Sequence, residues 1–458
     1  MSEAKQENSG KLRFGCVVFD DPAAHSTGWK AIEENPATRV NIEGTGSLST
    51  DIIWMTNLAY QISQTSGLYG NYRFLTSEYL REQLGRMAAR HGINADSDPR
   101  GMAEFGSKLL SRVMRLSKRI LDVDPEDDFL PRFNLRQGYR DLIGPGRDPV
   151  YPTEMAKRIE EAISYNTNCE REQYIPAGED VIVYFRIPPR EHCLSVLDVN
   201  LPYGDFIEIP KGDLPAPKAS IEEMQNWLVT KTEGCPGFFK ITCRSFDPTF
   251  NSLINFGDSA NGMGVSSYKR QWVSSPEVAF LATFSEMTIH QAFITRSRYR
   301  LHQQIELVKS MPEQTDLSIS IGVFFDNLWT GMCMRSSARL GQNSPDKISI
   351  NVFVPFIRAM DRVKLFEKAI QFAHAGFDVV GYGAGALRVS IKNQDPIKIY
   401  NICKQARMLP PFLGCKEGSL PGGDGGDLLT KMQMAYATSS FSWLMDVDKK
   451  IVDKLAPQ

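Results

Sequence analysis

The sequence predicts an α+β protein, with a helix-rich N-terminal part and a C-terminal part in which helices cover one face of a mixed or antiparallel sheet. Two observations predict this class. Before residue 122 apolar residues recur mainly at helical spacing, whereas after residue 180 short β-rich or alternating runs are separated by turns. With 458 residues, 42% of them hydrophobic, the chain can bury the cores of about two or three domains.

Changes in composition divide the chain into four expected regions. The first is a disordered arm, the second is mainly helical, and the third is an α+β domain with β-rich segments. The fourth is a flexible Gly/Pro-rich linker followed by an apolar interaction tail. The bounds of the four regions are 1–11, 12–170, 171–415 and 416–458.

The N-terminal elements begin with an apolar run, Phe14–Phe19, which predicts a strand that ends at an Asp-Asp-Pro turn. Apolar residues at helical spacing, among them Ile52 and Met55, then predict a helix that Ser49 or Thr50 could cap. Further helical patterns cover 75–91 and 102–121.

The C-terminal part contains the clearest alternation, LSISIGV at 317–323, which is typical of a half-buried strand. Asp361 precedes an apolar stripe and could cap the helix that the stripe predicts. The predicted strands are 181–187, 238–244, 317–323, 329–335, 348–354, 377–380 and 386–392. The predicted helices are 220–231, one or two helices over 277–309, 363–373 and 396–407.

The overall charge excludes a globally basic protein, because 52 Lys and Arg residues oppose 54 Asp and Glu residues. Any surface for nucleic acid must therefore be local. The eight cysteines occur singly and without CxxC pairs, as is typical of reduced thiols. Since no apolar run approaches the ~20 residues of a membrane span and the N-terminus lacks a signal-peptide core, we expect a cytoplasmic protein without membrane contact.

Familiar motifs for cofactors, metals and catalysis are missing from the sequence. The glycines Gly381, Gly383 and Gly385 could let a phosphate approach the backbone, but strand periodicity follows them, which favours a hairpin turn or bulge. The six histidines form no metal-binding pair at helical spacing. We therefore expect no cofactor and no metal, while an active site assembled from distant residues stays open.

A helix, a glycine-rich loop and a strand follow one another from Asp361 to Lys392. This succession resembles the repeat-associated RNA-binding folds of CRISPR effector subunits, although the loop lacks that family's fuller glycine pattern. In those folds the three elements contribute to a surface that grips RNA. The resemblance therefore implies RNA as a partner.

Two basic stretches are the candidate nucleic-acid-binding residues. In the first, cations at helical spacings of about 3 and 4 share one ridge, where they could contact phosphates. In the second, cations alternate with an aromatic residue that could stack on unpaired bases. The first stretch contains Lys108, Arg112, Arg115 and Arg119, and the second contains Lys269, Arg270, Arg296, Arg298, Tyr299, Arg300 and His302.

These observations favour a non-catalytic nucleic-acid-binding subunit of a larger ribonucleoprotein or nucleoprotein assembly. RNA or single-stranded DNA would be its partner, and the tail at 416–458 would contact other proteins or a second copy. Two alternatives remain. One is a viral or other structural protein that assembles by exchanging arms, and the other is an enzyme with a dispersed, motif-free active site.

Overall fold

The computed structural model describes most of the chain, with gaps. It describes residues 13–24, 26–41, 47–58, 72–74, 85, 88, 93, 96–121, 150–164, 168–170, 181–245, 247, 253, 267–269, 272–333, 339–341, 344–391, 396–411, 428–437 and 441–457. The expected arm at 1–11, the helix at 75–91 except for Gly85 and Ala88, and the expected linker from 416 to 427 lie outside these ranges.

Contacts within the chain divide it into two compact units, each built from separate segments of the sequence. Unit 1 combines three separate segments, 1–138, 318–327 and 441–458. Unit 2 combines 139–317 with 328–440. The last helix of the chain therefore belongs to the same unit as the first strand.

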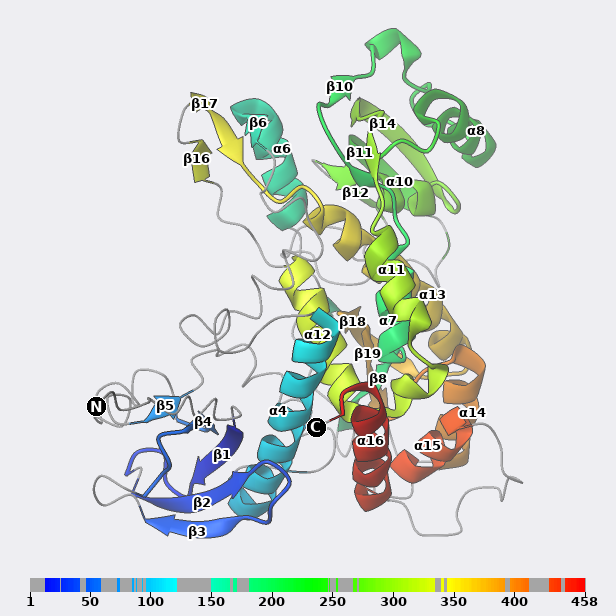
Figure 1. The fold of residues 1–458 in the computed structure, drawn as a ribbon. Helices are drawn as coiled ribbons and strands as arrows, with labels where there is room; N and C mark the ends of the chain where they lie inside the picture. Colours follow the sequence, from blue (N-terminus) through cyan, green and yellow to red (C-terminus); the bar gives the residue numbers. More distant parts are fainter. Residues whose placement is uncertain are drawn as a thin grey trace, which may run out of the picture. The chain divides into compact units, whose positions relative to one another are not determined.

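Unit 1 is built on a five-stranded sheet in the order β3-β2-β1-β4-β5 (Figure 1). Strand β1 pairs antiparallel with β2 and parallel with β4. The long helix α4 packs against β1 and β2. The bounds are β1 Arg13–Phe19, β2 Thr27–Ile32, β3 Thr38–Asn41, β4 Ile52–Thr56, β5 Arg73–Phe74 and α4 Pro99–Leu121.

Strands β1 and β4 are buried on both faces, which decides how α4 can approach them. Val17 and Trp54 belong to the apolar cluster of unit 1, whereas Cys16 and Met55 lie beneath Gly106 of α4. A Cβ atom at Gly106 would come within 2.7 Å of the Met55 Cε and 2.8 Å of the Cys16 Sγ. The missing side chain thus lets the helix lie close to the sheet.

Unit 2 contains two larger sheets and a shared apolar core. One sheet has the order β10-β14-β11-β12 with β13 beside β11, and the other has the order β7-β18-β19-β8. The pairings in both sheets are antiparallel. Helices α10, α13 and α14 contribute residues to the core cluster that also includes Phe185, Phe239 and Leu387.

The smaller elements of unit 2 include the two-stranded ribbon β9-β15 and the sheet β16-β17-β6. The strands are β6 Val150–Pro152, β7 Asn168–Glu170, β8 Val181–Arg186, β9 Leu201–Pro202, β10 Ile207–Glu208, β11 Gly237–Ser245, β12 Ser267–Lys269, β13 Val273–Ser274, β14 Ser285–Ile294, β15 Arg298–Tyr299, β16 Arg339–Gly341, β17 Ser344–Ser349, β18 Asp378–Gly383 and β19 Ala386–Ile391. The helices are α6 Thr153–Ser164, α7 Pro189–Leu197, η2 Lys211–Asp213, α8 Ile221–Thr232, α10 Ser275–Leu281, α11 His302–Ser310, η3 Glu313–Leu317, α13 Val354–His374, α14 Pro396–Ala406 and α15 Leu428–Ala437. Helix α12, Ile319–Cys333, begins in unit 1 and ends in unit 2, and α16, Phe441–Leu455, lies in unit 1.

The predicted α+β class is confirmed, since several antiparallel sheets occur together with helices. The predicted strands at the start of the chain, at 181–187 and at 238–244 are confirmed as β1, β8 and β11. The helices at 102–121, 220–231 and 396–407 are confirmed as α4, α8 and α14. Seven described strands, β1 to β7, lie in the region that we expected to be mainly helical.

Several local predictions are wrong. The strand expected at 329–335 is the end of helix α12 as far as Cys333, and of the strand expected at 348–354 only Ile348 and Ser349 belong to β17. The helix expected from Ile52 is strand β4, because a strand buried on both faces has no polar alternation to distinguish it from a helix. The strand expected at 317–323 is largely the start of α12, and part of the helix expected over 277–309 is strand β14. Asp361 does not cap a helix but lies inside α13, where it is buried.

Within the described residues, no helix is both long and apolar enough to cross a bilayer. The same residues contain no group of three or more His, Cys, Asp or Glu side chains that could hold a metal ion.

Candidate nucleic-acid interface

The first basic stretch lies on α4 as its spacing predicts, and we call Lys108, Arg112, Arg115 and Arg119 the basic ridge. Its members differ in exposure along the helix. Lys108 is half-buried, Arg112 is 2% exposed, Arg115 is half-buried and Arg119 is exposed. The ridge therefore offers solvent one exposed cation, Arg119, and part of the other two.

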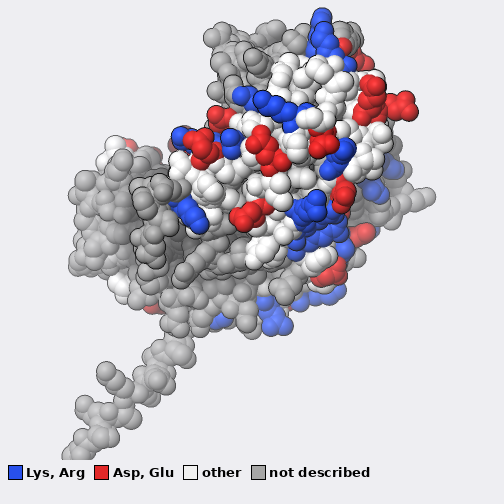
Figure 2. Space-filling view, turned by 90° about the horizontal axis from the view of Figure 1, so that it is seen from above, with Lys and Arg blue, Asp and Glu red and all other residues white. Residues whose placement is uncertain are grey.

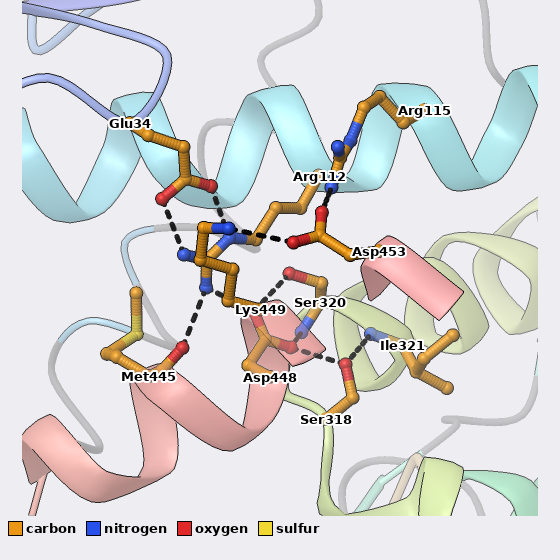
Figure 3. A network of polar contacts seen from close by, with 10 residues as sticks. All are labelled: Glu34, Arg112, Arg115, Ser318, Ser320, Ile321, Met445, Asp448, Lys449 and Asp453. Atoms are coloured by element: carbon orange, nitrogen blue, oxygen red, sulfur yellow. Dashed lines mark hydrogen bonds and ion pairs between the residues drawn. The ribbon is translucent and has the colours of Figure 1, made fainter. Parts of the chain in front are cut away.

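Arg112 is bound by carboxylates of its own chain (Figure 3). Its Nε and Nη2 donate to the two carboxylate oxygens of Glu34, both at 2.7 Å, and its Nη1 donates to Asp448 at 2.7 Å. Burial alone would lower the pKa of Arg112, but the hydrogen bonds and charges of Glu34 and Asp448 outweigh burial and raise it. Arg112 therefore remains charged and engaged, and we leave it out of the proposed interface.

Arg115 is also engaged by the C-terminal helix. Its Nη2 donates to Asp453 of α16 at 2.7 Å, and Lys449 donates to the other oxygen of Asp453 at 2.7 Å. Hydrogen bonds from Lys449 and Arg115 lower the pKa of Asp453, although its partial burial acts in the opposite direction. The carboxylates of α16 thus occupy the middle of the basic ridge (Figure 3).

The second basic stretch forms one strand of the ribbon β9-β15. Arg298 is paired with Pro202 and Tyr299 with Leu201, and the Tyr203 amide donates to the Ser297 carbonyl at 3.2 Å. Thr295 Oγ1 closes the end of the ribbon by donating to the Tyr203 carbonyl at 2.8 Å. The ribbon thus holds the basic stretch in extended conformation.

The extended backbone separates the aromatic residue from the cations, because successive side chains of a strand point to opposite faces. The Tyr299 ring stacks on Phe353, with centroids 5.7 Å apart and an angle of 5° between the rings. The Tyr203 ring also lies near Tyr299, at a centroid distance of 6.4 Å. Tyr299 therefore packs into the protein instead of lying beside the arginines as a platform for bases.

Three exposed arginines remain, and we call Arg296, Arg298 and Arg300 the arginine row. Arg298 and Arg300 alternate with Tyr299, and Arg296 extends the row from the bend before β15. Arg298 Nη2 donates to the Glu233 carbonyl at 2.6 Å, and Arg300 Nε donates to Asn200 Oδ1 at 2.9 Å. Within the described residues, none of the three forms an ion pair with a carboxylate.

The remaining candidates contribute less. His302 is exposed at the start of α11. Lys269 ends β12, where it is paired with Thr242, and Arg270 lies outside the described residues. Figure 2 shows Lys and Arg side chains interspersed with Asp and Glu over the described part of one face, so any positive surface there is small.

A buried network that the sequence did not reveal holds the glycine-rich loop. Ala384 and Gly385 both have positive φ, 48° and 74°, as a two-residue turn between β18 and β19 requires. Their amides donate to Asp361 at 2.7 and 2.9 Å, and His192 Nε2 lies 2.7 Å from the same carboxylate. Gly385 therefore lies in the hairpin turn that we expected from the strand periodicity, whereas Gly383 ends β18 and Gly381 adjoins an irregularity in the pairing of β18 with β19.

The described cysteines with shifted pKa values are buried. Burial raises the pKa of the Cys16 thiol to about 12 and also raises the pKa values of Cys193 and Cys403. Since the thiolate is the nucleophilic form, these three residues are unsuited to nucleophilic catalysis.

No protein-family model matches the chain, and no curated protein matches it. Among solved structures, the chain is similar to Phi29 DNA polymerase in an orthorhombic crystal form, with 9% identity and a TM-score of 0.43 over 84% of this chain and 81% of the polymerase. The match to that polymerase complexed with primer-template DNA and incoming nucleotides has 10% identity and a TM-score of 0.38, over 68% of this chain and 60% of the polymerase. The complex with single-stranded DNA gives 10% identity and a TM-score of 0.37, over 68% and 59%. Similarity at this level supports no conclusion about the activity of this chain.

Proposed function

We propose that this chain is a non-catalytic nucleic-acid-binding subunit of a larger nucleoprotein assembly, and that the arginine row of the ribbon binds the phosphate backbone. One observation carries the proposal. Arg296, Arg298 and Arg300 are exposed, and within the described residues none of them has a carboxylate partner.

The spacing of the row suits a chain of phosphates. Alternate residues of an extended strand lie about 6.7 Å apart, and each guanidinium presents several N–H donors to phosphate oxygens. Arg298 and Arg300 each use one nitrogen for an anchoring bond to the protein. These bonds limit the conformations of both side chains and so reduce the entropy that ordering them would cost.

Binding through this row depends little on base sequence. Phosphate contacts orient a nucleic acid but carry no sequence information, and Tyr299 is stacked on Phe353 on the side of β15 away from Arg298. We therefore expect single strands of different sequence to bind with similar affinity. Whether RNA or DNA is the partner is left to the experiment.

The test is the salt dependence of binding, measured by fluorescence anisotropy with labelled single-stranded RNA and DNA. Each phosphate neutralised on a single strand contributes about −0.7 to the slope of log K against log salt concentration. The triple substitution Arg296→Ala, Arg298→Ala, Arg300→Ala should weaken binding and reduce the magnitude of the slope by about 2.

A matched control removes the same charge elsewhere. Lys211, Lys404 and Lys454 are exposed on three other elements, and replacing all three with alanine should leave the slope nearly unchanged. Equal effects of the two triple variants would contradict the proposal, since binding would then follow net charge alone. An intact chain that binds neither polymer at low salt would contradict it outright.

That the tail at 416–458 contacts other proteins or a second copy of the chain remains a prediction. The described tail helices pack within the chain, α15 against α14 and η3, and α16 against α4. Light scattering on the intact chain tests for self-assembly. A deletion of 416–458 would be harder to interpret, because it also removes Asp448 from Arg112.

A further inference from the structure

The carboxylate of Asp448 is fully buried and takes two donors on each oxygen (Figure 3). Oδ1 accepts the Ser320 amide at 2.8 Å and the Ser318 hydroxyl. Oδ2 accepts Arg112 Nη1 at 2.7 Å and the Ser320 hydroxyl at 2.8 Å. The carboxylate is therefore hydrogen-bonded as completely as a bound anion in a dedicated site.

All four donors come from elements other than the helix that carries the carboxylate. Arg112 lies on α4, and Ser318 and Ser320 lie at the N-terminus of α12, where Ser318 Oγ also accepts the Ile321 amide at 3.1 Å. The first turn of a helix carries a partial positive charge and unpaired amides. A guanidinium, two hydroxyls and a helix N-terminus together are a combination that binds carboxylates and phosphates.

The site is also held in place without Asp448. Glu34 binds Arg112 through two hydrogen bonds of 2.7 Å on the opposite side of the guanidinium. With Arg112 only 2% exposed and so fixed, its Nη1 points toward the position of the Asp448 carboxylate. Preorganised donors of this kind cost little to order when an anion binds.

We propose that these donors form an anion-binding site in unit 1, and that α16 is its tethered ligand through Asp448. Without the Asp448 side chain, the site takes a small carboxylate such as formate from solution. Helix α16 is then held to the rest of unit 1 by the binding of the Asp448 carboxylate as well as by its buried apolar residues Leu444 and Val452. This inference does not rest on the proposed nucleic-acid binding.

The experiment is chemical rescue of the full chain carrying Asp448→Ala. Its thermal unfolding is followed in sodium formate and in sodium chloride at equal ionic strength. We expect the midpoint in chloride to fall by several degrees relative to the unaltered chain, and to rise saturably with formate. Asp446→Ala is the matched control, since Asp446 is exposed on the same helix, and its midpoint should not change in either salt.

Two further variants test whether the formate response requires the space left by Asp448 and the guanidinium of Arg112. Asp448→Asn fills the space with a neutral amide, so its midpoint should fall without a response to formate. The double variant Asp448→Ala, Arg112→Ala should lose the formate response. If Asp448→Ala does not fold in chloride, the readout is the folded fraction recovered in formate.

Three results would overturn the proposal. The first is no difference between formate and chloride, whether in the midpoint or in the folded fraction. The second is an equal formate response in the asparagine variant. The third is a response that survives the loss of Arg112.

Discussion

The arginines of α4 and those of the ribbon are both spaced so that they can share one face, at intervals of three or four residues in the helix and two in the strand. Their surroundings are opposite. Arg112 is 2% exposed and bound to Glu34 and Asp448, whereas Arg298 is exposed and anchored to a carbonyl. Spacing thus indicates which cations share a face, but it does not indicate whether they form ion pairs with carboxylates of the same chain.

The largest expected difference between the two groups is in stability. Arg112→Ala leaves Asp448 buried without its opposite charge, and breaking a buried pair in this way costs about 3 to 5 kcal/mol. Urea unfolding should show this loss in the transition of unit 1. Arg119→Ala, at the exposed end of the same helix, should stay within about 0.5 kcal/mol. If both variants lose the same stability, the contrast between buried and exposed members of the basic ridge is wrong.

Asp316 in unit 2 is a largely buried carboxyl that differs from Asp448 in its hydrogen-bond donors. Its Oδ1 accepts the Arg190 amide at 2.7 Å at the start of α7. Burial raises the pKa of Asp316 from 3.8 to about 6, with a smaller contribution from the charge of Glu191, although the bond to Arg190 opposes the shift. Asp448, by contrast, receives a guanidinium directly.

The sign of the resulting pH dependence follows from this raised pKa. Between pH 4 and 6 the folded chain holds a proton that the unfolded chain has released, so stability falls as the pH rises through about 6. The loss is on the order of 3 kcal/mol, since each pKa unit corresponds to about 1.4 kcal/mol. Asp316→Asn should remove it and make the stability of unit 2 flatter over this range in urea unfolding. A variant with the same pH profile as the unaltered chain would show that another group is responsible.

Replacing arginine with lysine separates geometry from charge. Lysine cannot reproduce the two parallel bonds that Arg112 makes to Glu34, so Arg112→Lys should cost about 1 to 2 kcal/mol of stability. Arg298→Lys keeps a cation on an exposed strand, and it should change neither the stability nor the salt slope of binding appreciably. A larger stability loss at Arg298 than at Arg112 would reverse our interpretation of the two sites.

Much of the fold could be predicted because its signals are local. Helix α4 and the hairpin β18-β19 follow from periodicity and turn residues. The wrong prediction at β4 has a local reason too, since all five of its residues are buried and no alternation marks the strand. The prediction at 317–323 was wrong for a different reason, which the local pattern of apolar residues could not indicate.

In that segment the small polar residues were interpreted as the exposed side of a strand. Ser318 and Ser320 are instead buried, and both bind Asp448, which lies 130 and 128 residues away in the sequence. The burial of Arg112 in the basic ridge was unpredictable for the same reason, since the carboxylate partners of Arg112 and Arg115 come from 34, 448 and 453. A residue's distant partners decide its exposure, and one sequence does not indicate them.

The smallest expected effect concerns the aromatic residue of the ribbon. Tyr299 stacks on Phe353 in parallel geometry, and such aromatic pairs contribute about 0.5 to 1.5 kcal/mol beyond burial. Tyr299→Leu should lower the stability of unit 2 by about this amount while leaving the affinity for single strands and its salt slope unchanged, because Tyr299 faces away from the arginine row. Anisotropy with an abasic strand supplies the matching measurement on the ligand. Weaker binding by the variant, together with weaker binding of the abasic strand, would mean that bases stack on Tyr299 and that the two faces of the ribbon act together.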